Sequence, residues 1–364
     1  MFAGAYQGKK VLVTGHTGFK GSWLCTWLLE LGAEVAGYSL SIPTQPANFE
    51  VLGLKQQIQH YNGDLRHRDR LFEVMNDFYP DLVFHLGAQS LVRHSYQNPA
   101  ITFETNTLGT MNLLECLRHQ PSVSAAVIIT SDKCYRNQEW IWGYRENDNL
   151  GGDDPYSASK ACAELICHSY TTSFFNKDRP VIATARAGNV IGGGDWAPDR
   201  LVPDCIRAWS AGQTVKVRNP QATRPWQHVL EPISGYLWLG ARLFAENSLA
   251  GESINFGPPA VVNQSVGDLL EIITQQWPGA SWELEFKKQE QQPESNLLKL
   301  CCDKALNLLQ WRAILSFQDT IRMTIDWYRH YYESASEDMY LLSRQQIFKY
   351  QDLAKKEGLP WALT

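Results

Sequence analysis

The sequence predicts an α/β protein with a doubly wound parallel sheet. Short apolar runs rich in β-branched residues recur along the first half of the chain, and stretches with helical periodicity separate them. The first run, residues 10–15, ends in glycine and passes directly into a helical pattern. Strands and helices that alternate in this way pack as a parallel sheet with right-handed crossovers.

A glycine-rich turn joins the first expected strand to the first expected helix. Its glycines stand at 15, 18 and 21, within Gly15-His16-Thr17-Gly18-Phe19-Lys20-Gly21. Such a turn lets the backbone approach a pyrophosphate, whose negative charge the following helix N-terminus attracts. All residues of this segment are therefore candidate ligands of a dinucleotide, in a domain of the Rossmann type.

The second expected strand lacks a residue that such domains usually have. An acid normally follows the glycines by about 20 residues and binds the adenosine ribose. Here residues 33–39 end in Ser39 without an acid after it, and no arginine stands there to bind a 2′-phosphate. We therefore predict NAD rather than NADP, with Ser39 or the backbone beside it at the ribose.

Further strands, and the point where the alternation of strands and helices ends, define the expected domains. Strands are predicted at residues 58–61, 81–86, 125–130 and 181–185, with a last one near 253–256. From about residue 187, glycine- and proline-rich connections interrupt the alternation. We expect residues 1–187 to bind the dinucleotide, with strand 253–256 completing the sheet. Residues 188–364 should form mainly a smaller, mixed substrate domain that ends in a helical tail.

Tyr156 and Lys160 are the most informative pair in the chain. Asp153 or Asp154 can cap a helix that Pro155 begins, so the tyrosine and the lysine share one helical face. An ammonium about 4 Å from a phenol is worth about 4 kcal/mol at an effective dielectric of about 20, enough to bring a pKa of about 10 toward neutrality. Such a tyrosinate can accept an alcohol proton while hydride leaves the same carbon. A solvated pair on an amphipathic helix is the alternative for this motif taken alone.

Together, the glycine turn and the Tyr156–Lys160 pair resemble the extended short-chain dehydrogenase/reductases. After the fifth strand come Ser131, Asp132 and Lys133, where nucleotide-sugar 4,6-dehydratases carry Thr-Asp-Glu. The Asp-Lys pair is typical of CDP-glucose 4,6-dehydratases, and the resemblance to that family runs from about Gly8 to Tyr331. The segments that also carry it are residues 14–23, 188–196 and 224–229.

The resemblance implies a redox cycle that converts CDP-glucose to CDP-4-dehydro-6-deoxyglucose and water. Tyr156, supported by Lys160, would take the C4 hydroxyl proton while Ser131 bonds the C4 oxygen and hydride passes to NAD⁺. Asp132, with a pKa raised by burial, would protonate the departing C6 hydroxyl. Lys133 would remove the C5 proton or stabilise an enolate, and hydride would return to C6. An aspartate that merely caps a turn is the alternative for Asp132. The product would feed CDP-linked 3,6-dideoxyhexoses of bacterial surface polysaccharide, as in lipopolysaccharide O-antigen biosynthesis.

The resemblance and the strand ends together give the remaining candidate contacts, because ligands of open α/β sheets collect at the carboxyl ends of strands. Beyond the glycine turn, the cofactor contacts are Ser39, Asp64, Leu65, Leu86, Ala88, Gln89, Asn106, Tyr156 and Lys160. The expected substrate contacts are Ser90, Asn189, Arg200, Arg218, Arg224 and Trp226. Arginine forks suit a diphosphate, but each arginine could equally be a surface residue.

Composition excludes several other classes. A net charge of −5 gives no basic field for nucleic acid, and no apolar run reaches the ~18 residues that cross a membrane. Residues 1–10 lack the apolar core of a signal peptide, so a cytoplasmic protein is expected. The cysteines and histidines show no metal-binding spacing. The resemblance further implies a homodimer or homotetramer.

Two other functions are compatible with parts of the pattern. A 4-epimerase or reductase of the same superfamily would use the cofactor and Tyr156, but it has no need of Asp132. A non-catalytic NAD-binding sensor would keep the fold, although such proteins usually lose the tyrosine or the lysine, and both are present here.

Overall fold

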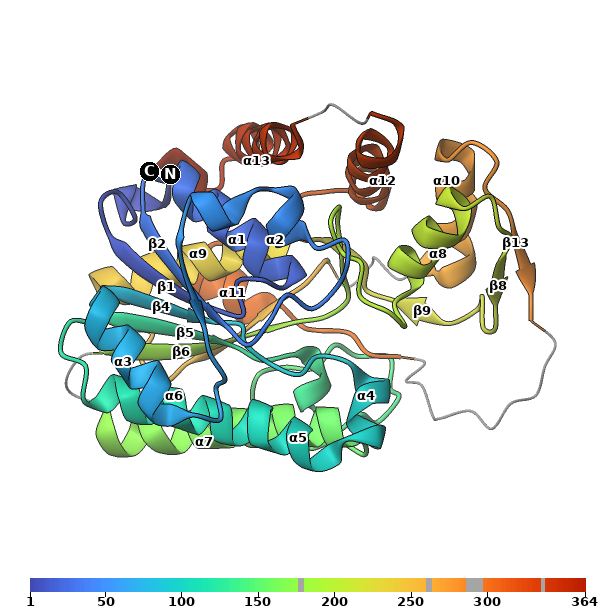
Figure 1. Ribbon diagram of the computed structural model, residues 1–364. Helices are drawn as coiled ribbons and strands as arrows, with labels where there is room; N and C mark the ends of the chain where they lie inside the picture. The colour runs from blue at the N-terminus through green and yellow to red at the C-terminus, as the bar shows by residue number, and fades with distance from the viewer. Residues whose placement is uncertain (176–179, 260–263, 286–296, 335–337) are drawn as a thin grey trace.

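A seven-stranded parallel sheet forms the centre of the computed structural model, which describes residues 1–175, 180–259, 264–285, 297–334 and 338–364 (Figure 1). The strand order is β11-β6-β5-β4-β1-β2-β3. The strands are β1 (Lys10–Thr14), β2 (Glu34–Ser39), β3 (Gln59–Asn62), β4 (Leu82–His85), β5 (Ala125–Ile129), β6 (Val181–Ala187) and β11 (Ser253–Phe256). Each lies at a predicted strand, so the predicted doubly wound sheet is confirmed.

Side chains of the sheet alternate between two hydrophobic cores. On one face Val11 and Val13 pack with Trp23 of α1 (Phe19–Glu30) and with α9 (Leu230–Ala245). On the other face Leu12 packs with the helices α3 (Arg68–Phe78), α6 (Gly109–Arg118) and α7 (Pro155–Phe174). Each fully buried valine or leucine stabilises the fold by about 1.5–3 kcal/mol, so a one-residue slip in register would be costly.

The strand order reverses between β1 and β4, because β1 lies between β2 and β4 while β5, β6 and β11 extend the sheet beyond β4. A crevice forms at such a switch point, outside the carboxyl ends of the strands. The glycine turn after β1, residues 86–90 after β4 and residues 131–133 after β5 all leave the sheet at this edge.

A second group of elements lies beside the sheet and consists of short strands and helices (Figure 1). The strands pair as β7 (Val190–Ile191) with β10 (Gln227–His228), β8 (Val215–Val217) with β13 (Trp282–Leu284), and β9 (Thr223–Arg224) with β12 (Gln264–Ser265). The helices of the group are α8 (Leu201–Ser210) and α10 (Val266–Gln276). The substrate domain starting at residue 188 remains a proposal. Two elements after that residue, α9 and β11, belong to the large sheet and its core and not to the second group.

The C-terminal helices are α12 (Phe317–Glu333), α13 (Met339–Lys356) and α14 (Pro360–Leu363). Helix α13 packs on α1, where the Tyr340 hydroxyl donates to Glu30 at 3.3 Å and Tyr350 meets Trp27 edge to face. Among the described helices, none is both long and apolar enough to cross a bilayer. The remaining short elements are the helices α2 (Asn48–Val51), α4 (Val92–Gln97), α5 (Pro99–Phe103) and α11 (Asp303–Leu309), the 3₁₀ turns Phe2–Gly4, Leu54–Gln56 and Asp132–Cys134, and the π turn Glu104–Leu108.

Candidate active site

The glycine turn is shaped so that a phosphate can approach the backbone. Gly15 has a φ of +74°, and a Cβ there would lie 2.7 Å from the Gly87 nitrogen. A Cβ on Gly21 would lie 2.2 Å from the Gly15 carbonyl oxygen, so helix and strand pack too closely for any side chain. Helix α1 begins at Phe19 without a side-chain cap on its N-terminus. This cradle fits the pyrophosphate of a dinucleotide.

His16 occupies the region where an acid usually follows strand two. Its Nδ1 lies 3.0 Å from Ser39 Oγ, and its Nε2 lies 2.7 Å from His60 Nδ1. The ring packs directly on Gly37, where a Cβ would come within 2.1 Å of it. Burial lowers the pKa of His16 to about 3, so the imidazole is neutral at pH 7. Ser39 is therefore hydrogen-bonded to a neutral imidazole, and neither group supplies the negative charge that the usual acid would.

Asp64 and Leu65 follow β3 and reach the same crevice. Arg66 grips both Asp64 oxygens through its Nε, at 3.1 and 3.0 Å, and these hydrogen bonds lower the pKa of the carboxyl. Leu65 packs on the loop after β4, since a Cβ on Gly87 would lie 2.7 Å from its Cδ1. The Asp64 carboxylate is thus paired with Arg66, and Leu65 forms part of the crevice wall.

Asn106 connects the loop after β4 to the catalytic helix. Its Oδ1 accepts from the Gln89 N–H at 2.8 Å, and its Nδ2 donates to the Gln89 carbonyl and to Ser159 Oγ, both at 2.9 Å. The π turn Glu104–Leu108 presents this side chain, and π turns are common at functional sites. Asn106 therefore fixes the segment that contains Leu86, Ala88 and Ser90 relative to α7, beside Tyr156 and Lys160.

Helix α7 starts as the sequence predicted. Asp154 is its N-cap and accepts from the Ser157 N–H at 2.9 Å, and Pro155 is the first helical residue. Tyr156 and Lys160 are both buried, at 8% and 6% exposure. The Tyr156 hydroxyl is hydrogen-bonded to the Ser131 side chain, so the pair predicted for the C4 oxygen is brought together.

The predicted lowering of the Tyr156 pKa is wrong for the protein alone. Burial raises the pKa of Tyr156 to about 12, outweighing the Ser131 hydrogen bond, and burial lowers the pKa of Lys160 to about 8. The Lys160 ammonium donates to the Ile129 carbonyl at 3.4 Å. Desolvation disfavours both charged forms, which spacing along a helix does not reveal.

Asp132 lies in a 3₁₀ turn directly after β5. Ser131 Oγ donates to Asp132 Oδ1 at 3.0 Å and accepts from the Lys133 N–H at 3.2 Å. Burial raises the pKa of Asp132, as the sequence predicted for an acid that must hold a proton. A Cβ on Gly188 would lie 3.1 Å from Asp132 Oδ2 and 3.5 Å from Pro225 Cγ, so the carboxyl faces the loops of the second group.

The structure brings some predicted substrate residues to this centre and leaves one apart. Arg200 pairs with Asp195 at 2.8 Å and interacts electrostatically with Tyr156. Arg224 and Trp226 flank Pro225, close to Asp132, and the Asn189 carbonyl accepts from the Gln227 N–H at 3.1 Å. Arg218 follows β8 in the second group of elements and lies 3.9 Å from Glu285.

Sequence reasoning missed three features of the centre. Lys20 interacts electrostatically with Arg200, Asp132, Lys160 and Asp195, and burial lowers its pKa to about 8, so it faces the catalytic centre as well as the glycine turn. Asp195 was not predicted, although its place after a run of glycines was a usable signal. Tyr236 of α9 interacts electrostatically with Asp132 and Tyr156, and its buried hydroxyl has no hydrogen-bond partner among the described residues. Its sequence context gives only a core tyrosine.

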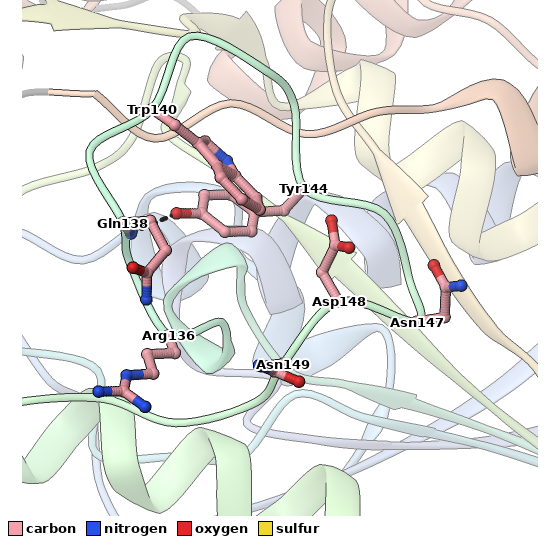
Figure 2. A pocket seen from close by; sticks show the side chains of 7 residues that line it. All are labelled: Arg136, Gln138, Trp140, Tyr144, Asn147, Asp148 and Asn149. Atoms are coloured by element: carbon pink, nitrogen blue, oxygen red, sulfur yellow. Dashed lines mark hydrogen bonds between the residues drawn. The ribbon is translucent and has the colours of Figure 1, made fainter.

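A hollow in the loop after the catalytic turn lies outside this centre. It has a volume of about 440 Å³ and opens within residues 136–149, the loop that follows the catalytic turn (Figure 2). Tyr144 forms its aromatic wall, stacked between Trp140 and Tyr135 at 5.1 Å from each. The lining residues are Arg136, Gln138, Trp140, Tyr144, Asn147, Asp148 and Asn149. None of them is a predicted site residue. Across the described ranges, no cluster of acids, histidines and cysteines could hold a metal ion.

Comparisons with known proteins agree with this architecture. The CDP-glucose 4,6-dehydratase of Salmonella typhimurium is 45% identical over 351 residues, which cover 95% of this chain and 97% of that protein. An epimerase from Methanothermobacter thermautotrophicus superposes with a TM-score of 0.78 at 25% identity, covering 91% of this chain and 95% of the other. The dTDP-glucose 4,6-dehydratase DesIV of Streptomyces venezuelae, solved with NAD and TYD, shares the fold with a TM-score of 0.73 at 23% identity, over 88% of this chain and 97% of the other. The sequence model of the GDP-mannose 4,6 dehydratase family matches residues 12–324, and the chain therefore belongs to that family.

Proposed function

We propose that the protein is an NAD-dependent CDP-glucose 4,6-dehydratase, a hydro-lyase that forms CDP-4-dehydro-6-deoxyglucose and water. The observation that carries the proposal is the buried acid Asp132, hydrogen-bonded to Ser131, which in turn bonds Tyr156. An oxidising centre alone needs the tyrosine, the lysine and the serine. A buried acid directly beside them, whose pKa burial raises, provides the proton donor that a dehydration needs in addition. The 45% identity to the Salmonella typhimurium enzyme supports CDP-glucose as the substrate.

The residues of the crevice fit NAD. The glycine cradle and the open N-terminus of α1 would hold its pyrophosphate, and the Ser39 side of β2 would receive the adenosine ribose without a charge. When bound, NAD⁺ supplies a hydride acceptor for C4 and a hydride donor for C6. Because the cofactor is regenerated in each turnover, catalytic amounts of it suffice.

Oxidation at C4 depends on α7 and on Ser131. Tyr156 takes the C4 hydroxyl proton, so its phenol must first be ionised. Burial opposes this ionisation, because it raises the pKa of Tyr156 to about 12. Lys160, whose pKa of about 8 leaves it mostly protonated at pH 7, supplies positive charge beside the forming tyrosinate. Ser131 Oγ bonds the C4 oxygen and holds it during the proton transfer.

Elimination across C5 and C6 depends on Asp132 and Lys133. The ketone at C4 acidifies the C5–H bond, so oxidation must come first. We propose that Lys133 removes the C5 proton or stabilises the resulting enolate. Asp132 donates its proton to the C6 hydroxyl, which leaves as water. Burial raises the pKa of Asp132 and so favours the protonated form that this step uses.

Incubation with CDP-, UDP-, GDP- and dTDP-glucose, with and without added NAD⁺, tests the proposal. The 4-keto product is followed through the chromophore that it forms in alkali. We expect signal from CDP-glucose, and a requirement for added NAD⁺ would reflect the missing strand-two acid. Signal from another nucleotide would overturn the substrate. NAD binding without any signal would favour the epimerase or the sensor.

We also propose that the protein assembles as a homodimer or homotetramer and works in the cytoplasm, where NAD and nucleotide sugars are available. Exposed apolar side chains on neighbouring helices support an assembly surface. They include Ile101 of α5, Leu108 of the π turn, and Leu165 and Phe174 of α7.

A further inference from the structure

A buried ion pair lies directly behind the proposed catalytic centre. Arg186 of β6 donates its Nε to Glu164 Oε1 at 2.9 Å and its NH2 nitrogen to Oε2 at 2.8 Å. The side chains are 3% and 2% exposed. Taking two charges out of water costs as much as their attraction returns, so such a pair is weak evidence for stability alone. Its other contacts indicate a different role.

Both partners of the pair also bind the segment that contains the proposed acid and base. Thr130 Oγ1 donates to Glu164 Oε1, and Thr130 directly precedes Ser131. At the other end, Arg186 donates its NH1 to the Tyr135 hydroxyl at 2.7 Å and lies over the tyrosine ring, 4.9 Å from its centroid. Tyr135 follows Lys133 by two residues. One ion pair therefore holds residues 130–135 at both ends.

The same carboxylate is linked to the oxidising side of the centre. Glu164 stands four residues after Lys160 on α7, so the two share a helical face. Its negative charge stabilises the ammonium of Lys160, opposing the effect of burial. The carboxylate thus contacts the turn that contains Asp132 and faces the lysine that supports Tyr156.

A third strand fixes the far end of this segment. The Tyr135 hydroxyl donates to Asn255 Oδ1 of β11 at 2.8 Å, and Asn255 Nδ2 donates to the carbonyls of Tyr144 and Cys301 at 2.8 and 3.0 Å. The stack of Tyr135 on Tyr144 continues into the wall of the hollow in Figure 2. Tyr135 is therefore anchored to strands β6 and β11 through a single hydroxyl.

We propose that Glu164 and Arg186 are positioning residues that hold residues 130–135 against α7. They keep Asp132 and Lys133 beside C6 and C5, near the C4 hydroxyl that Tyr156 deprotonates. This inference rests on the proposed function and deepens it, because it assigns the two ends of the segment to different stages of the reaction. The Thr130 end positions Ser131 for oxidation, and the Tyr135 end positions Asp132 and Lys133 for elimination.

Removing one hydroxyl at each end tests the proposal. We expect Tyr135→Phe to slow product formation roughly tenfold, as loss of a buried hydrogen bond to a charge would, while C4 oxidation is largely kept. Reduced cofactor should then accumulate during turnover, visible by its absorbance. Thr130→Val should instead slow the appearance of reduced cofactor and of product together.

Tyr350→Phe is the matched control. Like Tyr135, Tyr350 is a fully buried tyrosine with a hydrogen-bonded hydroxyl, which here donates to Glu231 Oε2 at 2.6 Å, but Tyr350 lies on α13. We expect it to lower the melting temperature about as much as Tyr135→Phe and to leave the ratio of reduced cofactor to product unchanged. Equal loss of both stages in Tyr135→Phe, or the same kinetics as in the control, would overturn the proposal.

Hydrogen exchange keeps the test independent of the substrate. The amides of Cys134 and Tyr135 bond to the carbonyls of Ser131 and Asp132 at 3.2 and 3.3 Å. In Tyr135→Phe these amides should exchange about tenfold faster, while those of α7 stay protected. If wild-type protein turned over no nucleotide sugar, the proposed function would fail, and faster exchange would still support the positioning. Unchanged exchange at these amides would contradict it.

Discussion

Ser131 donates its hydroxyl hydrogen to Asp132 at 3.0 Å, while the same side chain is hydrogen-bonded to Tyr156. The side chain that would hold the C4 oxygen is therefore hydrogen-bonded to the side chain that would protonate the C6 hydroxyl. This contact links the oxidising and eliminating halves of the centre through one short turn after β5. It also allows the two halves to be separated by mutation.

Replacing the acid should stop the reaction midway. Asp132→Asn keeps the size of the side chain but cannot donate an acid proton, so product formation should fall by roughly 10²–10⁴-fold. Oxidation at C4 should persist, and reduced cofactor should build up on the enzyme, measured by absorbance after mixing with CDP-glucose. Asp148→Asn, in the loop outside the centre, should behave as wild type. Loss of reduced cofactor in Asp132→Asn would assign the aspartate to oxidation instead.

Removing the phenol should block the first step. Tyr156→Phe should lower the formation of reduced cofactor by roughly 10²–10⁴-fold and leave NAD binding intact. Because burial raises the pKa of Tyr156 to about 12, the tyrosinate fraction grows with pH. In wild type, single-turnover oxidation should therefore speed up from about pH 6 to about pH 8, where half of Lys160, with its pKa of about 8, has lost its charge. A rate that is flat or falls over this range would contradict the role of Tyr156 as base.

The glycine cradle should not tolerate a methyl group. A Cβ at Gly21 would lie 2.2 Å from the Gly15 carbonyl, so Gly21→Ala must displace the turn that receives the pyrophosphate. We expect NAD affinity to fall at least about tenfold, measured by calorimetry. Gly267→Ala is the control, since Gly267 lies on α10 and its Cβ would lie 3.4 Å from its nearest neighbour, the Pro220 carbonyl oxygen. Unchanged affinity in Gly21→Ala would place the cofactor elsewhere.

Acid should destabilise the protein through buried histidines. His85 bonds Thr14 at 2.7 Å and Thr110 at 3.1 Å, and burial lowers its pKa from 6.5 to about 3. The unfolded chain therefore binds more protons than the folded one between these values, and stability is lost as pH falls below 6.5. By linkage this amounts to about 2 kcal/mol for one histidine at about pH 5.

The variant His85→Gln keeps polar atoms for both threonines and does not titrate. Urea unfolding at pH 7 and pH 5 should show a pH-dependent loss of unfolding free energy smaller than in wild type by about 2 kcal/mol. The same loss in both proteins would show that His85 is not the titrating group.

Local sequence patterns were enough to predict the sheet and the start of α7. Apolar runs bounded by turn residues marked every strand of the large sheet, and Asp154 followed by Pro155 marked the helix. The short strands β8 and β13 have only three residues each, too few for a periodic pattern, and they were not predicted.

What the sequence could not supply depends on long-range packing. The spacing of Tyr156 and Lys160 places them on one face, but it does not show how strongly burial opposes both charges. The Glu164–Arg186 pair forms only because α7 packs against β6, and no local pattern links a helical acid to a strand arginine. Tyr236 interacts electrostatically with Asp132 for the same reason, because its helix α9 packs against β5.

The fate of the C4 hydrogen tests the central claim most directly. CDP-glucose carrying deuterium at C4 would be turned over in ordinary water, and the product would be analysed by NMR and mass spectrometry. A single active site that oxidises C4, eliminates water and returns the same hydride should give a 4-keto-6-deoxy product with deuterium at C6. Deuterium retained at C4 of a product that has the opposite configuration at C4 and still has its C6 hydroxyl would contradict the dehydratase and identify an epimerase.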